Sequence, residues 1–251
     1  MRKNNKLLRL MVMSVLIALG VVISPILRFE GMCPMAHLIN IVCSVLLGPF
    51  ESLLCAVLIG IIRMALMGIP PLALTGAVFG AFLSGVLYRI SKGRLLFAVL
   101  GEVVGTGIIG ATASYPVMTF IWGKEGLTWL FYVPSFICGT LIGGSIAFVF
   151  LKKLSVSGLL TEFQNKLGSP AYQDRGGVIS NSLTVMSFGV ICYIVIKTLT
   201  GIFSVNGRLW DIISYLLLGG FVLAGLIYLA ATKTKRGKDY DRCNKQNKAG
   251  G

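Results

Sequence analysis

The residues of this chain best suited to chemistry are a few polar side chains inside long apolar runs. His37 is the only histidine, and Asn40 follows it by three positions. Arg63 and Glu102 also lie within apolar stretches. Lipid tolerates such side chains poorly, so those kept at membrane depth usually face a protein interior or a ligand. These four residues are therefore the candidates for a binding site.

His37, Asn40 and Ser44 stand at i, i+3 and i+7, so they share one face of a helix. An imidazole and an amide offer donors and acceptors with little charge, which suits a neutral heteroaromatic ligand. The alternative is that His37 lies at the outer membrane interface with its ring in water. Arg63 either pairs with Glu102, which gives both a structural role, or extends outward without a partner.

The sequence contains no arrangement typical of an enzyme or a metal site. G-x-S-x-G, H-E-x-x-H and Walker A patterns are absent, and there is no second histidine. The six cysteines include no C-x-x-C pair. We predict no catalytic residue, no bound metal and no cofactor, and the chain cannot itself drive transport by hydrolysing ATP.

Composition places these residues in an α-helical integral membrane protein. Of the 251 residues, 55% are hydrophobic and 13% are charged, and the mean hydropathy is +0.84. A soluble domain normally carries about a quarter charged residues. Several apolar runs approach the roughly 20 residues that span a bilayer as a helix, and open sheets are excluded from lipid because their backbone groups are unpaired.

The apolar runs and the breaks between them predict eight helices. We place them at residues 7–24, 37–47, 51–67, 74–90, 95–121, 129–151, 178–203 and 212–231. The second is too short to cross a membrane upright, and Pro116 is expected to bend the fifth. The chain then divides into a substrate-binding membrane domain (1–151), a cytoplasmic linker (152–177), an extra transmembrane hairpin (178–231) and a basic, disordered cytoplasmic tail (232–251).

The net charge of +14 lies mainly at the ends of the apolar runs. With both termini in the cytoplasm, all but five of the 23 lysines and arginines fall on the inner side, the five being Arg28, Arg63, Lys124, Lys197 and Arg208. This is the positive-inside pattern of a multi-pass plasma-membrane protein. The basic tail is expected to contact anionic lipid, and this distribution argues against nucleic-acid binding.

Small residues recur four positions apart in three of the predicted helices. Examples are Gly76-x3-Gly80-x3-Ser84, Gly101-x3-Gly105 and Gly139-x3-Gly143. Such spacing lets helix backbones approach closely. We interpret these seams as packing surfaces rather than ligand contacts.

The order of these features resembles the ThiW family. The resemblance lies in Pro34-x2-His37-x2-Asn40, in Val45-Leu46-Leu47-Gly48-Pro49, in Arg63, and in the block Gly101-Glu102-Val103-Val104-Gly105-Thr106-Gly107-Ile108-Ile109-Gly110. It covers about residues 7–151. ThiW proteins are substrate-binding (S) components of energy-coupling-factor (ECF) vitamin transporters and are associated with hydroxyethylthiazole, a thiamine precursor.

The resemblance implies an all-α, six-helix S-component-like bundle that binds its ligand near the outer face; here a two-helix hairpin follows it. The residues expected to bind substrate are His37, Asn40, Arg63, Glu102, Thr106 and Tyr115. The implied partners are a transmembrane coupling protein and two ATPase subunits, with Ser14 and Ala18 on the contact surface.

Two departures from the family pattern keep a related substrate open. Ala36 stands where the family has glutamine, and Leu74-Thr75-Gly76-Ala77 stands where it has Phe-Pro-Gly-Ser. A self-sufficient secondary carrier for a small neutral heterocycle is the other alternative, although no internal duplication typical of such carriers is evident.

Overall fold

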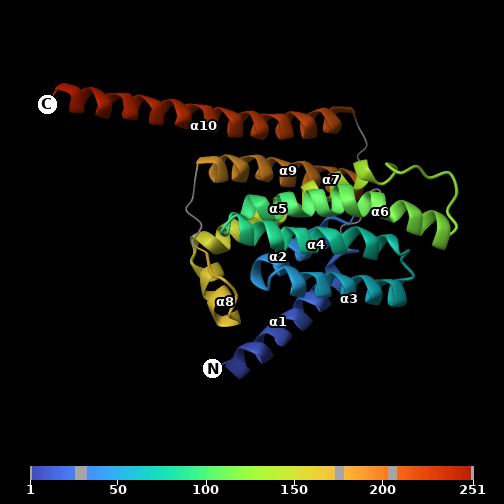
Figure 1. Ribbon diagram of the computed structural model, residues 1–251. Coiled ribbons are helices and arrows are strands. Elements are labelled where there is room, and N and C mark those ends of the chain that lie inside the picture. The colour runs from blue at the N-terminus through green and yellow to red at the C-terminus, as the bar shows by residue number, and fades with distance from the viewer. Residues whose placement is uncertain (1, 26–32, 173–177, 203–207, 250–251) are drawn as a thin grey trace. The chain divides into compact units, whose positions relative to one another are not determined.

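The computed structural model describes residues 2–25, 33–172, 178–202 and 208–249, and within these ranges every regular element is a helix and none is a strand (Figure 1). The chain divides into two compact units, Met1–Asp174 and Arg175–Gly251. Each unit is described by itself below.

The first unit follows the predicted order of helices closely. Its elements are α1 (Arg2–Ile23), α2 (Pro34–Leu46), α3 (Pro49–Met67), α4 (Leu72–Ile90), α5 (Leu95–Val104), η1 (Gly105–Gly110), α6 (Ala111–Pro116), η2 (Val117–Ile121), α7 (Val133–Val156) and α8 (Leu159–Leu167). Gly48 has φ +110° just before Pro49, and Gly68 ends α3 with φ +61°. Glycine adopts such angles without strain, so the sequence breaks seen at these positions separate the helices in the structure.

Six helices within the described residues are long and apolar enough to cross a membrane. They lie at Asn5–Ile23, Pro49–Met67, Leu72–Ile90, Leu95–Ile121, Val133–Val156 and Trp210–Thr232. Helix α2 has 13 residues, about 20 Å at 1.5 Å per residue, which is shorter than a hydrocarbon core of about 30 Å. The protein is therefore a multi-pass membrane protein, and α2 is an apolar helix shorter than a full span.

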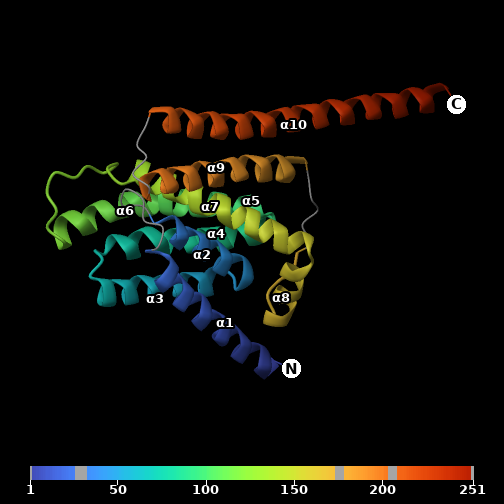
Figure 2. The same cartoon turned by 180° about the vertical axis from the view of Figure 1, so that it is seen from behind.

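Helix α2 packs against α1, α3, α4, α5 and α7, and both views draw it among the helices of the first unit (Figures 1 and 2). Ten of its residues are buried, including His37, Asn40 and Ser44. The face that carries these polar side chains is thus turned into the protein rather than into lipid.

The helical run from Leu95 to Ile121 contains two π-helical segments, η1 and η2. The second begins directly after Pro116. Proline has no N–H to donate to the preceding turn, and in the turn after Pro116 the hydrogen bonds widen to the π-helical spacing, with the Trp122 N–H donating to the carbonyl of Val117. A bend at Pro116 stays a prediction.

The interval predicted as a linker, residues 152–177, contains the end of α7 and the whole of α8. Leu160, Gln164 and Leu167 are buried. Gln164 Nε2 donates to the carbonyl of Val45 at 3.0 Å and to the Tyr88 hydroxyl at 3.1 Å. Helix α8 therefore belongs to the first unit and is attached to α2 and α4.

The second unit consists of α9 (Val178–Ile202) and α10 (Arg208–Ala249), which pack against each other. A Cβ on Gly189 would lie 2.4 Å from Phe221, and one on Gly225 would lie 2.7 Å from Met186, so both glycines mark close approaches. Helix α10 continues to Ala249 through the tail that the sequence predicts to be disordered. That tail contains several lysines, arginines and glutamine, which favour helix.

Candidate functional site

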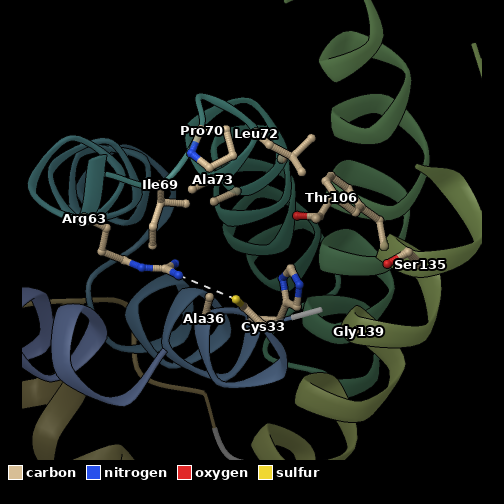
Figure 3. A pocket seen from close by; sticks show the side chains of 14 residues that line it. Cys33, Ala36, Arg63, Ile69, Pro70, Leu72, Ala73, Thr106, Ser135 and Gly139 are labelled. Carbon is tan, nitrogen blue, oxygen red and sulfur yellow. Dashed lines mark hydrogen bonds between the residues drawn. The ribbon is translucent and has the colours of Figure 1, made fainter. Parts of the chain in front are cut away.

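A cavity of about 80 Å³ lies in the first unit beside the beginning of α2 (Figure 3). A single water needs about 10–15 Å³ measured in this way, so the cavity has room for a small ligand. Most of the lining is apolar, with polar groups from a few side chains. The lining residues are Cys33, Ala36, His37, Arg63, Ile69, Pro70, Leu72, Ala73, Gly76, Ala77, Thr106, Ser135, Phe136 and Gly139.

Three side chains converge on one oxygen of Glu102 behind the cavity wall. His37 Nδ1 lies 2.9 Å from Glu102 Oε1, Asn40 Nδ2 donates to it at 3.0 Å, and the Thr106 hydroxyl donates at 3.1 Å. Glu102 is fully buried, and its other oxygen, Oε2, has no hydrogen-bond partner. The carboxyl group thus holds two side chains of α2 and one of η1 in a fixed arrangement.

Local helix geometry explains this convergence. His37 and Asn40 are one turn apart on α2, and Glu102 and Thr106 are one turn apart where α5 passes into η1. Gly80 of α4 gives the cluster its space, because a Cβ there would lie 1.9 Å from Thr106 Oγ1 and 2.8 Å from Glu102 Oε2.

Helix α7 approaches His37 from another side at Gly143. A Cβ on Gly143 would lie 2.1 Å from the carbonyl oxygen of Pro34 and 2.9 Å from His37 Cβ. Any larger residue would displace the start of α2. The small residue therefore fixes the place of His37 as well as the packing of two helices.

The predicted site residues divide into those that line the cavity and those behind its wall. His37, Arg63 and Thr106 line it, whereas Asn40 and Glu102 do not: Glu102 bonds to the lining side chains of His37 and Thr106, and Asn40 bonds to Glu102. Because Nδ1 of His37 is bonded to Glu102, Nε2 is the ring nitrogen left for a ligand.

Tyr115 is not among the lining residues. Its ring packs against Trp129 with centroids 4.5 Å apart and planes 39° apart. A role for Tyr115 in binding stays a prediction.

Arg63 forms neither of the arrangements considered from the sequence. Its side chain is buried, and among the described residues it makes no ion pair with Glu102 or any other carboxylate. Nη2 donates only to the sulfur of Cys33 at 3.5 Å, and Nε has no partner. The guanidinium therefore points along the cavity wall (Figure 3) without a charged partner in the described chain.

Several lining residues were not predicted from the sequence. Cys33, Ile69, Pro70 and Phe136 come from the start of α2, the α3–α4 connection and α7, which are far apart in sequence. The Gly68-Ile69-Pro70-Pro71 break was a signal for the connection, although not for its place beside His37.

Two of the positions at which the chain departs from the ThiW pattern also meet this cavity. Gly76 matches the family's glycine, and Leu74 and Thr75 are not among the lining residues, but Ala36 and Ala77 line the cavity. These substitutions therefore bear directly on the shape of the ligand that fits.

The two residues expected to contact a partner protein lie on α1. Ser14 and Ala18 are both exposed, and the Ser14 hydroxyl donates to the carbonyl of Leu10 at 3.0 Å. Large exposed apolar side chains surround them, namely Leu7, Leu10, Met11, Val15, Leu19 and Val22. The opposite side of α1 buries Met13 and Leu16 against the bundle.

The family model described as thiamine-precursor transporter protein (ThiW) matches residues 10–157, more than half of the chain. The chain belongs to the ThiW family. It is accordingly a thiamine-precursor transporter and not an enzyme, as the sequence motifs predicted. All the residues that line the cavity fall within the matched range. No curated protein and no solved structure matches the chain significantly.

Proposed function

We propose that this ThiW protein is the S component of an ECF transporter and that its ligand is hydroxyethylthiazole. The observation that carries the proposal is the position of His37, which lines a small, mostly apolar cavity while Glu102 holds its Nδ1. Small-molecule sites typically combine an apolar lining with a few fixed polar groups. A thiazole ring with a methyl and a hydroxyethyl substituent has the matching chemistry.

The cavity walls suggest how the ligand is held. When Nδ1–H donates to Glu102, the neutral imidazole keeps its lone pair on Nε2, which accepts the ligand hydroxyl. Phe136, Ile69 and Leu72 provide apolar surface for the ring and methyl group. Glu102 acts through His37 and Thr106, whose side chains it holds in place, and Asn40 donates to the same oxygen of Glu102.

The proposed orientation has both termini in the cytoplasm. The positive-inside distribution of lysine and arginine supports it. In this orientation α1 to α7 form the six-helix S-component-like bundle, with the α5–η2 run counted as one helix and the short α2 as another.

The proposed partners are a transmembrane coupling protein and two ATPase subunits. The chain has no Walker A sequence, so ATP hydrolysis would have to be supplied by another subunit. The exposed face of α1 around Ser14 and Ala18 is an apolar surface where a coupling protein can approach closely.

The ligand is tested by isothermal titration calorimetry of the purified protein. Hydroxyethylthiazole, thiamine and the aminopyrimidine precursor are titrated separately. We expect hydroxyethylthiazole to bind most tightly. Absence of binding by all three would refute the proposed ligand.

The partners are tested by co-purification and by uptake. Recovery of ATPase subunits with the tagged chain, together with uptake only when they are present, supports the S-component assignment. Ligand uptake into liposomes by the chain alone would instead identify a secondary carrier.

A further inference from the structure

Arg63 is a buried cation for which the described part of the protein provides no counter-charge. It is 4% exposed and lines the cavity. Its Nε has no hydrogen-bond partner, and its Nη2 contacts only the half-buried thiol of Cys33 at 3.5 Å. A guanidinium has five N–H donors, so most of its capacity to bond is unused.

Among the described residues, which do not include Glu30, neighbouring carboxylates do not supply the missing charge. Glu102 Oε1 is occupied by His37, Asn40 and Thr106. Glu51, on the same helix as Arg63, pairs with Arg9. A buried charge without a partner is strongly unfavourable, so a cation kept at the cavity wall indicates an anionic partner that arrives with the ligand.

The shape of the guanidinium narrows the chemistry of that partner. A ligand hydroxyl brings no negative charge and accepts only one of the guanidinium N–H bonds. A carboxylate or phosphate is negatively charged and accepts two parallel N–H bonds. His37 and Arg63 both line the cavity, so one small molecule can contact both.

We infer that the cavity also recognises an oxyanion through Arg63, so that among ligands with the thiazole ring of hydroxyethylthiazole it binds those whose side chain ends in a carboxylate or a phosphate more tightly than the alcohol. The inference rests on the proposed function, since it assumes a thiazole ligand at this site. It assigns Arg63 the role of choosing between thiazoles according to the charge on the side chain.

The experiment compares three ligands by calorimetry on the full-length protein in detergent. They are hydroxyethylthiazole, its phosphate ester, and the thiazole with a carboxymethyl group in place of the hydroxyethyl group. We expect at least one of the two anions to bind at least tenfold more tightly than the alcohol, and the better anion identifies the oxyanion.

Two variants locate the preference at Arg63. In Arg63→Gln the preference for the anion should fall to threefold or less, and in Arg63→Lys it should be partly kept because the charge remains while the planar fork is lost. The alcohol serves as the control ligand, since its affinity should change less than that of the anions.

Alkylation of Cys33 gives a second readout that needs no variant. Its sulfur lies 3.5 Å from Arg63 Nη2, so an oxyanion bound there should slow modification of Cys33 by maleimide more than the alcohol does at equal occupancy. Cys138 is exposed and outside the cavity lining, and its modification in the same sample should be unaffected.

The possible results separate this inference from the proposed function. If hydroxyethylthiazole binds and neither anion binds more tightly, the oxyanion site is wrong and the proposed function stands. If no thiazole binds, the proposed function itself fails. If an anion is preferred but the preference survives in Arg63→Gln, the assignment to Arg63 is refuted.

Discussion

Gly80→Ala should disrupt the cluster around Glu102 although it adds only a methyl group. The new Cβ would lie 1.9 Å from Thr106 Oγ1 and 2.8 Å from both Cδ and Oε2 of Glu102. Contacts below 3.0 Å require something to move. Thr106 would have to turn its hydroxyl away from Glu102 Oε1, and the carboxyl group that holds His37 would have to shift.

The expected energy follows from these displacements. A buried hydroxyl left without its partner costs about 1–3 kcal/mol, and forcing a methyl into a filled interior costs about 1–3 kcal/mol. Alanine is favoured over glycine in a helix by about 1 kcal/mol, which offsets part of the loss. We therefore expect the free energy of unfolding to fall by about 1–5 kcal/mol.

The assay is a double-mutant cycle with Thr106→Ala, read as the free energy of unfolding in mixed detergent micelles. Thr106→Ala removes the nearest atom to the new methyl group, so the double variant should be more stable than the sum of the single effects predicts. We expect a coupling energy of about 0.5–3 kcal/mol.

Gly219→Ala is the matched control. Gly219 lies in α10, and nothing lies within 4 Å of a Cβ built there, so this variant should keep wild-type stability or exceed it slightly. Additive effects of Gly80→Ala and Thr106→Ala, or equal behaviour of Gly80→Ala and Gly219→Ala, would refute the reasoning.

Three further substitutions, one of them with a matched control, test other parts of the structure. His37→Ala should weaken hydroxyethylthiazole binding by about 1–3 kcal/mol through lost and unpaired partners, and an unchanged Kd in calorimetry would place the ring outside the site. Gln164→Ala should lower the free energy of unfolding by about 1–3 kcal/mol because two acceptors on α2 and α4 lose this donor. Lys166→Ala, in an exposed pair of the same helix, should cost less than about 0.5 kcal/mol, and equal losses would contradict the attachment of α8. Ala18→Trp should leave ligand binding by the isolated chain unchanged but reduce recovery of ATPase subunits, and normal assembly and uptake would remove α1 from the partner surface.

The positions of the main helices could be predicted because their signals are local. Two apolar runs, one ending before Gly48-Pro49 and one ending before Gly68, have the lengths of helices and are followed by residues that end helices. In the structure these two runs form α2 and α3. The signal for α8 is also local. Leu160, Gln164 and Leu167 lie at i, i+4 and i+7, which is the buried stripe of an amphipathic helix in an otherwise polar stretch.

The contacts of the site could be predicted only in part. The sequence indicates that His37 and Asn40 share a helix face, and this holds because their spacing fixes it. Glu102 lies 65 residues after His37 in the sequence and contacts its Nδ1. This contact depends on how α2 and α5 pack against each other, and the periodicity of apolar residues does not specify that packing. The burial of Arg63 without Glu102 as its partner likewise follows from the packing of helices that are distant in sequence.

The glycines of α4 connect packing and binding more closely than their spacing indicates. Gly101 and Gly105 approach the α4 backbone at Ser84 and Gly80, where an added Cβ would lie 2.6 Å from a backbone Cα, so this seam sets the distance between helices. Gly80 lies on this α4 surface and is also next to the side chains of Thr106 and Glu102. The absence of a side chain at Gly80 therefore allows the two helices to approach closely and leaves space for the Glu102 carboxyl group. A substitution at Gly105 should therefore separate the helices and alter His37 indirectly, whereas one at Gly80 acts on the cluster itself. It follows that Thr106→Ala should relieve a defect at Gly80 and should not relieve one at Gly105, because the atoms that Gly105 meets are backbone atoms of α4.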